Sequence, residues 1–505
     1  MSDTRSGSSA PDLNGAPLQL DENRPQDRRV AYASLVGTTI EWYDYFIYAN
    51  AAALIFGPQF FNAVPPEQQF IVSFGTVGIS FLFRPLGAAV AGHYGDRIGR
   101  KKMLVLTLLL MGAATAIIGI LPTSATIGIW APILLVLMRI IQGFSAGGEW
   151  GGAALMAVEH APADKRGRFG AFPQVGVPLG MLVATGFLAM LAVVLSPEQF
   201  EAWGWRIPFI SSIALIGVGM WIRLGVAESP VFKEISEHKD EIKMPLAHLF
   251  RFNGKQVLLA ALIFAGNGVA GYMVTGGFIL AYTTNALEMN RDIILNLVTL
   301  ASATWMVTTG VGGWLADHIG RVRTYQLGFV PQLLWVFPLF MLVDTVEYIW
   351  VAVAMVVLSV GLGLTYGPQS ALFAEMFPAR IRYSGASMGY AIGSILGGAF
   401  APMIAQALVT STGTTISISI YLFAVTAIAM SATFFVKERM GGRLDKDAMD
   451  IPRRPRARGG AAEQGDLSAS WPSPRASTSG PISSGRTSAC VPIQLLARAP
   501  LSSGA

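Results

Sequence analysis

The feature that most constrains this chain is a series of long apolar segments, each long enough to cross a bilayer. A spanning helix needs about 20 apolar residues, because each residue adds 1.5 Å along the helix axis. Only 13% of the 505 residues are charged, where soluble proteins carry about a quarter. The sequence therefore predicts an all-α membrane protein with twelve transmembrane helices, at residues 31–56, 70–93, 103–121, 130–158, 169–195, 206–226, 257–284, 292–316, 325–343, 348–374, 384–409 and 416–436.

The placement of lysine and arginine in the connections predicts the topology. The connections after the first, third, fifth, ninth and eleventh segments contain neither residue, and the one after the seventh contains only Arg291. The remaining connections are basic, as in "GDRIGRKK" at 95–102. Because basic connections stay in the cytoplasm, this alternation predicts a multi-pass membrane protein with both termini cytoplasmic.

An internal repeat divides the chain into two halves. "GHYGDRIGR" at 92–100 is echoed by "GWLADHIGR" at 313–321, each following the second segment of its half. Repeated six-helix halves are typical of secondary transporters, which bind substrate between the halves. We expect a disordered N-terminal tail at 1–29, a six-helix half at 30–226, a cytoplasmic loop at 227–255, a second six-helix half at 256–437 and a disordered basic tail at 438–505.

Two carboxylates lie inside the first segment, in "GTTIEWYDYFIYAN". Glu41 and Asp44 are three residues apart. Tyr45 lies four residues after Glu41, and Tyr48 lies four residues after Asp44. Residues at these spacings share one face of a helix. Since a charge at mid-membrane costs a few kcal/mol against lipid, this face should point into the bundle. The carboxylates are candidate proton sites, or alternatively members of a buried ion pair that only ties helices together.

Cations that could pair with these carboxylates occur in neighbouring segments. Arg84 lies in the second segment and Arg139 in the fourth, where Glu149 follows ten residues later. An arginine lowers the pKa of a nearby carboxylate, so an anionic substrate that occupied the arginine would make the carboxylate easier to protonate. We therefore predict proton coupling by Glu41, Asp44 and Glu149, and substrate binding by Arg84, Arg139, Tyr45, Tyr48 and Gln174.

The repeated short loop predicts conformational machinery instead of a substrate site. Asp96 could lie at the N-terminus of a helix from the other half, where the helix dipole favours an anion. Alternatively, the positive charges of the loop only set the topology. The predicted conformational latch comprises Gly92, Asp96, Arg97, Gly99, Arg100, Asp317 and Arg321.

Several classes of protein lack support in the sequence. It contains no GxxxxGK[ST] phosphate loop, HExxH motif or GxSxG nucleophile elbow, and only five histidines and one cysteine. We therefore expect no enzyme activity, no metal site, no cofactor and no nucleic-acid partner. The expected partners are a small organic acid, protons and the lipid bilayer, and a twelve-helix bundle needs no second copy.

Taken together, the motifs resemble those of the major facilitator superfamily. The short loop resembles the signature loop of that superfamily, and further stretches resemble its metabolite:proton symporters. They are "EWYDYFIY" at 41–48, "FLFRPLG" at 81–87, "RIIQGFSAGGEWGG" at 139–152, "WGWRIPF" at 203–209, "ESPVF" at 228–232 and "FPARIRYSGASMGY" at 377–390. This branch includes carriers of shikimate, 2-oxoglutarate, citrate and other carboxylates, and of the zwitterions proline and betaine.

The resemblance implies a function, and it also has departures. It implies proton-coupled uptake across a bacterial inner membrane, with Glu41, Asp44, Arg84, Arg139 and Glu149 at charged positions of the family motifs. His318 stands in the second loop where the first has Arg97, so the latch should be weaker there. The C-terminal tail lacks the heptads of the osmosensing members, which argues against an osmoprotectant role.

The sequence therefore predicts secondary active uptake of a small carboxylate with protons, by alternating access. Alternatives are symport of a zwitterion such as proline or betaine, export, or a non-transporting membrane receptor built on the same fold.

Overall fold

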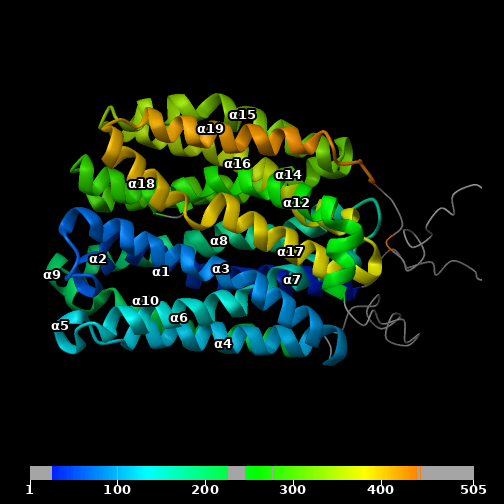
Figure 1. Cartoon of the computed structure of the whole chain (residues 1–505), viewed down its shortest axis with the longest axis horizontal. Coiled ribbons are helices and arrows are strands. Elements are labelled where there is room, and N and C mark those ends of the chain that lie inside the picture. The colour runs from blue at the N-terminus through cyan, green and yellow to red at the C-terminus, as the bar shows by residue number, and fades with distance from the viewer. Residues whose placement is uncertain (1–24, 99, 226–244, 276, 441–443, 445–505) are drawn as a thin grey trace, which may run out of the picture. The chain divides into compact units, whose positions relative to one another are not determined.

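The computed structural model describes residues 25–98, 100–225, 245–275, 277–440 and 444, and these are helical with short connections (Figure 1). The first half contains α1 (Pro25–Leu54), α2 (Phe56–Phe60), α3 (Pro66–Ile98), α4 (Arg100–Ile120), α5 (Ser124–Ile127), α6 (Trp130–Ala146), α7 (Glu149–Glu159), α8 (Arg166–Val194), α9 (Pro197–Gln199), η1 (Phe200–Gly204) and α10 (Arg206–Leu224). The second half contains α12 (Pro245–Thr275), α13 (Phe278–Ala281), η2 (Tyr282–Ala286), α14 (Arg291–Ile319), α15 (Arg321–Val343), α16 (Tyr348–Met376), η3 (Ala379–Ile381), α17 (Arg382–Ser394), η4 (Ile395–Ala399), α18 (Ala401–Thr412) and α19 (Ile416–Thr433).

The predicted all-α membrane fold is confirmed. Within the described residues, ten helices are long and apolar enough to span a membrane, or eleven if the bent pair Pro197–Gly204 and Arg206–Ile222 counts as one. The first predicted segment is α1, whose charged and hydroxyl side chains make it less apolar. Each of the twelve predicted ranges thus coincides with a helix or a broken helix.

Besides the bent pair, the described residues include interruptions in the fourth, seventh and eleventh spans. The fourth is interrupted at Gly147 and Gly148, between α6 and α7. The seventh is interrupted before α13, where Gly277 has a φ of +83° that favours glycine. The eleventh changes from α17 through η4 to α18 around Phe400. Broken helices are tolerated in a membrane protein where neighbouring helices cover the freed backbone groups.

The seventh span begins earlier than its apolar pattern suggests. α12 starts at Pro245, inside the range predicted as the central loop, and its backbone departs from helical geometry at Asn253. The residues of α12 that fall within the predicted loop include exposed Arg251, Phe252 and Lys255. Hydropathy therefore marks the apolar part of the span, whereas the helix continues into the polar region.

Glycines on the eleventh span allow it to approach the seventh closely. A Cβ atom at Gly393 would lie 2.6 Å from the carbonyl oxygen of Ala261, and one at Gly397 would lie 1.9 Å from that of Ala265. Gly389 likewise faces Ala260, whereas Gly385 faces Phe377. Three of these four glycines, spaced by four, thus form a small-residue interface between the two helices.

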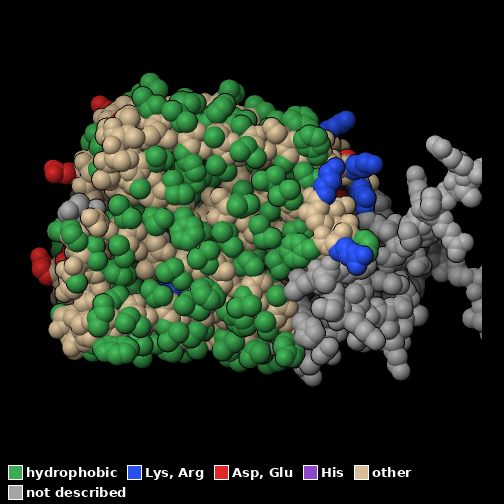
Figure 2. Space-filling model, in the orientation of Figure 1, with side chains coloured by type: hydrophobic (Ala, Val, Ile, Leu, Met, Phe, Trp, Pro, Cys, Tyr) green, Lys and Arg blue, Asp and Glu red, His purple; other side chains and the backbone are tan. Residues whose placement is uncertain are grey.

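The exposed charged residues of the described part gather at opposite ends of the bundle (Figure 2). We call one end the basic end, and its exposed cations include Lys165, Arg168, Arg251, Lys255, Arg323, Lys437 and Arg439. We call the other the acidic end, and its exposed carboxylates include Glu198, Glu201, Glu288, Asp292, Asp344 and Glu347. Green hydrophobic side chains cover the surface between these ends, as expected of a surface that faces lipid.

Candidate transport site

Asp44 lies in the middle of α1 and is almost completely buried inside the first half. Its Oδ2 accepts a hydrogen bond of 2.8 Å from the Thr115 hydroxyl on α4. Its Oδ1 accepts one of 2.6 Å from the Ser212 hydroxyl on α10. Both carboxylate oxygens are therefore bound by neutral hydroxyl groups, which can serve the charged and the protonated form alike.

A chain of side chains joins this carboxylate to Arg139. Thr115 Oγ1 accepts a hydrogen bond of 2.7 Å from Gln142 Nε2, on α6. Gln142 Oε1 in turn accepts one of 2.8 Å from Arg139 Nη1. The sequence predicted Asp44 and Arg139 as partners, and the structure connects them through two residues that the prediction did not include.

Arg139 is held mainly by α3. Its Nη2 donates to the carbonyl oxygen of Val77 at 3.2 Å and to the Ser80 hydroxyl at 3.0 Å. Its guanidinium carbon lies 3.9 Å from the ring centroid of Tyr48, a cation–π contact. The Tyr48 hydroxyl is 2.7 Å from Thr76 Oγ1. A buried guanidinium bound by carbonyl, hydroxyl and π groups keeps its positive charge and can attract an anion.

The other predicted charged residues are buried in the same half. Glu41 and Arg84 are each 3% exposed and Glu149 is 0% exposed. The Arg84 guanidinium carbon lies 4.2 Å from the ring centroid of Phe81. Glu149 is the first residue of α7. The first half thus contains the predicted set of two cations and three carboxylates, away from lipid.

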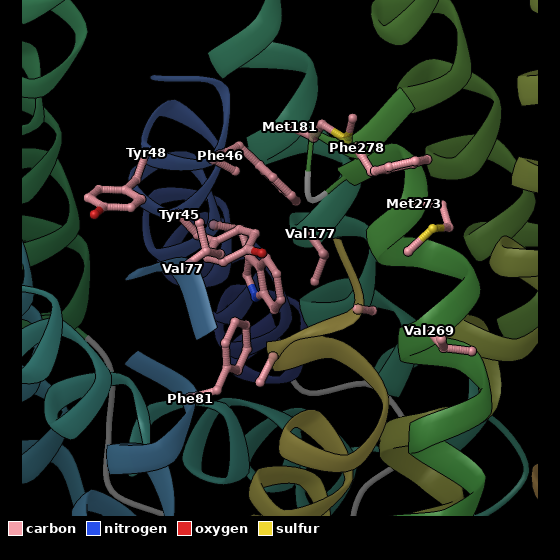
Figure 3. Close-up of a cluster of buried hydrophobic side chains, with 14 of the residues drawn as sticks. Tyr45, Phe46, Tyr48, Val77, Phe81, Val177, Met181, Val269, Met273 and Phe278 are labelled. Atoms are coloured by element: carbon pink, nitrogen blue, oxygen red, sulfur yellow. The ribbon is translucent and has the colours of Figure 1, made fainter. Parts of the chain in front are cut away.

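The predicted polar and aromatic face of α1 contacts two different surroundings. Tyr48 contacts Arg139 and Thr76 within the first half. Tyr45 belongs to a buried cluster drawn from both halves, with Phe81 and Val177 from the first and Met273 from the second (Figure 3). The ring centroids of Tyr45 and Phe81 are 5.6 Å apart. Tyr45 is therefore a predicted substrate-binding residue that lies among side chains of both halves.

Gln174 lies on the seam between the halves. Its Oε1 accepts a hydrogen bond of 3.1 Å from Trp150 Nε1, and its Nε2 donates to the carbonyl oxygen of Tyr366, on α16, at 3.4 Å. Trp150 stacks on Tyr390 of α17, with ring centroids 4.1 Å apart and planes at 5°. Gln174 and Trp150 thus connect the first half to two helices of the second.

Asp317, one of the residues predicted to form a latch, contacts the other half at the basic end. Asp317, near the end of α14, accepts hydrogen bonds from the backbone N–H groups of Gly167 at 2.7 Å and Arg168 at 2.9 Å. These groups belong to the first turn of α8, so a carboxylate of the second half caps a helix of the first. Within the second half, Arg321 Nη1 lies 3.4 Å from Asp317 Oδ1 and Arg321 Nη2 lies 3.3 Å from Glu375 Oε1.

His318 does not take part in this contact. Its ring packs on Trp314, with centroids 4.4 Å apart, and its Nδ1 is 2.8 Å from the carbonyl oxygen of that residue. The first copy of the loop lies outside the described residues: Gly99 is not described, and neither are the side chains at Asp96, Arg97 and Arg100 or the surroundings of Gly92.

The basic end has two further contacts between the halves, which the sequence prediction missed. Glu159 Oε1, at the end of α7, lies 3.5 Å from Nη1 of Arg382, at the start of α17. The Tyr383 hydroxyl donates to the carbonyl oxygen of Gly148. The sequence carried a signal for the first contact, because "EHAP" at 159–162 is repeated as "EMFP" at 375–378.

The two halves also contact each other at the acidic end, through weaker interactions. A Cβ atom at Gly277, before α13, would lie 3.1 Å from the carbonyl oxygen of Ala49, on α1. The guanidinium carbon of Arg291 lies 4.4 Å from the ring centroid of Phe200. The halves therefore touch at both ends, through ion pairs and a helix cap at one and through apolar and cation–π contacts at the other.

The residues missed within the site are neutral: Thr76, Ser80, Thr115, Gln142 and Ser212. Serine and threonine are common in helices, where their hydroxyls usually bond to the preceding turn, so the sequence pattern does not mark a special role. In the part of the chain that is described, no group of three or more histidine, cysteine or acidic residues could hold a metal ion.

Comparison with known proteins identifies the fold family. The family model described as Major Facilitator Superfamily matches residues 35–402. The chain belongs to this superfamily. Among solved structures, the superfamily proton:xylose symporter XylE, bound to a bromo-deoxy-glucose, matches with a TM-score of 0.66 over 83% of this chain and 98% of that one. Its sequence identity is 18%, so this likeness concerns the fold alone.

Relatives within the superfamily include metabolite transporters. A shikimate transporter of Escherichia coli (strain K12) is 41% identical over 81% of this chain and 94% of its own length. The inner membrane metabolite transport protein YhjE of the same strain is 40% identical over 81% and 94%. A putative proline/betaine transporter of Staphylococcus aureus (strain COL) is 30% identical over 82% and 89%. The chain is therefore a multi-pass metabolite transporter of the superfamily and not an enzyme, as the sequence predicted.

Proposed function

We propose that this protein takes up a small organic acid together with protons, across a bacterial inner membrane and by alternating access. The observation that carries the proposal is the buried chain from Arg139 through Gln142 and Thr115 to Asp44. It joins a group that can bind a carboxylate to a group that can bind a proton. The likeness to a shikimate transporter supports a carboxylate of that kind as the substrate.

The basic end is taken as the cytoplasmic end, with both chain termini on that side. The gathering of exposed lysine and arginine at this end supports the assignment, because basic segments are retained in the cytoplasm. The acidic end then faces the outside. The substrate site would lie between the halves 30–226 and 256–437, where Tyr45, Gln174 and Trp150 meet the second half.

In the proposed cycle, the acidic end opens first. Asp44 or Glu41 takes a proton from outside, and Arg139 or Arg84 binds the carboxylate of the substrate. The acidic end then closes, and the contacts of Asp317, Glu159 and Tyr383 at the basic end break. Substrate and proton leave to the cytoplasm. The two ends must open in turn, because simultaneous opening would let the proton leak.

The membrane potential can drive this cycle only if net positive charge enters with the substrate. It contributes about 2.3 kcal/mol per elementary charge per 100 mV. A monovalent acid moving with one proton carries no net charge, so accumulation driven by the potential needs a second proton. The three buried carboxylates Glu41, Asp44 and Glu149 provide more than one place for a proton.

Uptake into proteoliposomes tests the proposal. Radiolabelled shikimate, 2-oxoglutarate and citrate are tested under an inward proton gradient, together with the zwitterion betaine. We expect concentrative uptake of one of the acids and no uptake of betaine. Asp44→Asn should abolish uphill uptake while exchange of internal for external substrate persists. Asp344→Asn is the matched control, because Asp344 lies at the acidic end and binds Tyr282 and Thr415 within the second half.

Two outcomes would contradict the proposal. Uptake that does not respond to the proton gradient would reject proton coupling. Concentrative uptake of betaine and of none of the acids would show that the substrate is a zwitterion and not an organic acid. The name of the Staphylococcus aureus relative includes such a zwitterion.

A single carrier copy per vesicle should suffice for uptake, because the proposed site lies within one chain.

A further inference from the structure

We propose that the Thr115 hydroxyl is the switch that transmits the protonation state of Asp44 to Arg139. This proposal rests on the proposed proton-coupled uptake and assigns a positioning role to a residue that binds neither substrate nor lipid. Thr115 lies on α4 and is completely buried. Its hydroxyl joins Asp44 to Gln142 in the hydrogen-bonded chain described above.

The hydroxyl has one proton and two acceptors within reach. Thr115 Oγ1 lies 2.8 Å from Asp44 Oδ2 and 3.0 Å from the carbonyl oxygen of Met111, one turn earlier on α4. A hydroxyl can donate to only one of these at full strength, whereas its oxygen can accept two further hydrogen bonds. Thr115 therefore has two discrete arrangements of its proton without any movement of heavy atoms.

With Asp44 ionised, every donor in the chain points toward the carboxylate. Arg139 donates to Gln142, Gln142 donates to Thr115, and Thr115 donates to Asp44. Hydrogen bonds aligned in this way polarise one another, so the negative charge strengthens the hold of Gln142 Oε1 on the Arg139 guanidinium. The arginine is then partly neutralised by a carboxylate that it does not touch.

With Asp44 protonated, the first link reverses. The carboxylic acid donates its proton to Thr115 Oγ1, and the hydroxyl proton turns to the Met111 carbonyl oxygen. Thr115 Oγ1 still accepts from Gln142, so no buried group loses its partner. The charge that polarised the chain is gone, and Arg139 is more available to a substrate carboxylate. Substrate should therefore bind more tightly at lower pH.

Other charged groups around Asp44 act on its proton but lie outside this chain. Glu149 on α7 repels its charge, and on its own helix the Tyr43 phenol lies within electrostatic range while Glu41 is one turn away. α3 contributes Arg84 to the same half. α10 contributes the neutral hydroxyl of Ser212, which binds the other carboxylate oxygen. These groups set where Asp44 titrates, whereas Thr115 determines whether Arg139 responds.

Thr115→Val tests the switch, since valine keeps the shape of the side chain and removes the hydroxyl. The measurement is equilibrium binding of radiolabelled shikimate to the purified protein between about pH 5.5 and about pH 8.5, where coupling between two sites typically changes affinity by about fivefold or more. We expect tighter binding at low pH in the wild type. In Thr115→Val the affinity should change less than about twofold over the same range, because the link between proton and anion is cut.

Two further variants separate coupling from damage. Thr107→Val removes a hydroxyl from the same helix that donates to its own helix, at Leu104, and should leave the pH dependence intact. Thr115→Ser restores a hydroxyl and should restore the pH dependence. If Thr115→Val does not fold, Gln142→Met interrupts the same chain at its next link and should also flatten the pH profile.

The outcomes distinguish this inference from the proposed function. A wild type whose shikimate affinity and uptake do not depend on pH would reject proton coupling itself. A pH-dependent wild type together with an equally pH-dependent Thr115→Val would reject the switch alone. Failure of Thr115→Ser to restore the profile would also reject it, because the effect would then come from packing and not from the hydroxyl.

Discussion

Replacing Asp317 with asparagine should open the basic end of the transporter. Asp317 binds the backbone N–H groups of both Gly167 and Arg168 in the other half, one with each carboxylate oxygen. Asparagine has only one oxygen, so one N–H would face the amide NH₂ group instead of an acceptor. The charge that complements the N-terminus of α8 would also be lost.

The free energy that the closed state loses relative to the open state depends on the contacts that join the two halves. A hydrogen bond to a charged group contributes about 1.5–3 kcal/mol, and a charge at a helix terminus about 0.3–1 kcal/mol. The pair with Arg321 lies within the second half and is present whether the end is closed or open, so it cancels. The Arg168 side chain is 43% exposed, and a contact of that kind contributes little. The closed state should therefore lose about 2–3 kcal/mol, a shift of roughly 30- to 150-fold.

Distances between spin labels at the basic end measure this shift. Cys490 is the only native cysteine, so a Cys490→Ser background permits labels at two exposed positions, Ala163→Cys in the first half and Arg323→Cys in the second. Asp317→Asn should populate a longer distance that is minor in the parent. Asp344→Asn, at the acidic end, should leave the distribution unchanged. An unchanged distribution in Asp317→Asn would refute the reasoning that this helix cap holds the end closed.

Three further predictions concern other contacts. Arg139→Lys should lower substrate affinity about tenfold or more in a binding assay, because a compact ammonium lacks the planar, widely spaced N–H groups with which the guanidinium reaches Gln142, Val77 and Ser80. Gly397→Val should prevent accumulation of folded protein, because a Cβ atom at this position would lie only 1.9 Å from the Ala265 carbonyl oxygen. The yield of detergent-solubilised protein measures this, and a normal yield would contradict the prediction. Glu159→Gln should increase the labelled open population at the basic end by about tenfold or more, since it leaves Arg382 buried without its carboxylate, and no increase would contradict it.

Much of the fold could be predicted from the sequence because the bilayer is a demanding solvent. A segment such as 348–374 must be a helix, since backbone groups in lipid have to bond within the segment. The repeat around Asp317 predicted a latch, and the structure places that carboxylate at a helix N-terminus of the other half. The burial of Glu41, Asp44, Arg84 and Arg139 followed from the same argument, because a charge that faces lipid is too costly.

The tertiary structure alone decided which groups these charges meet. The sequence placed Asp44 and Arg139 in one set of buried charges, and the structure puts Thr115 of α4 and Gln142 of α6 between them. A hydroxyl or amide in a helix carries no pattern of its own, since it can bond to its own backbone or to a neighbour. The sequence determined which residues must avoid lipid, whereas the packing of the helices determined the route by which one buried charge can sense another.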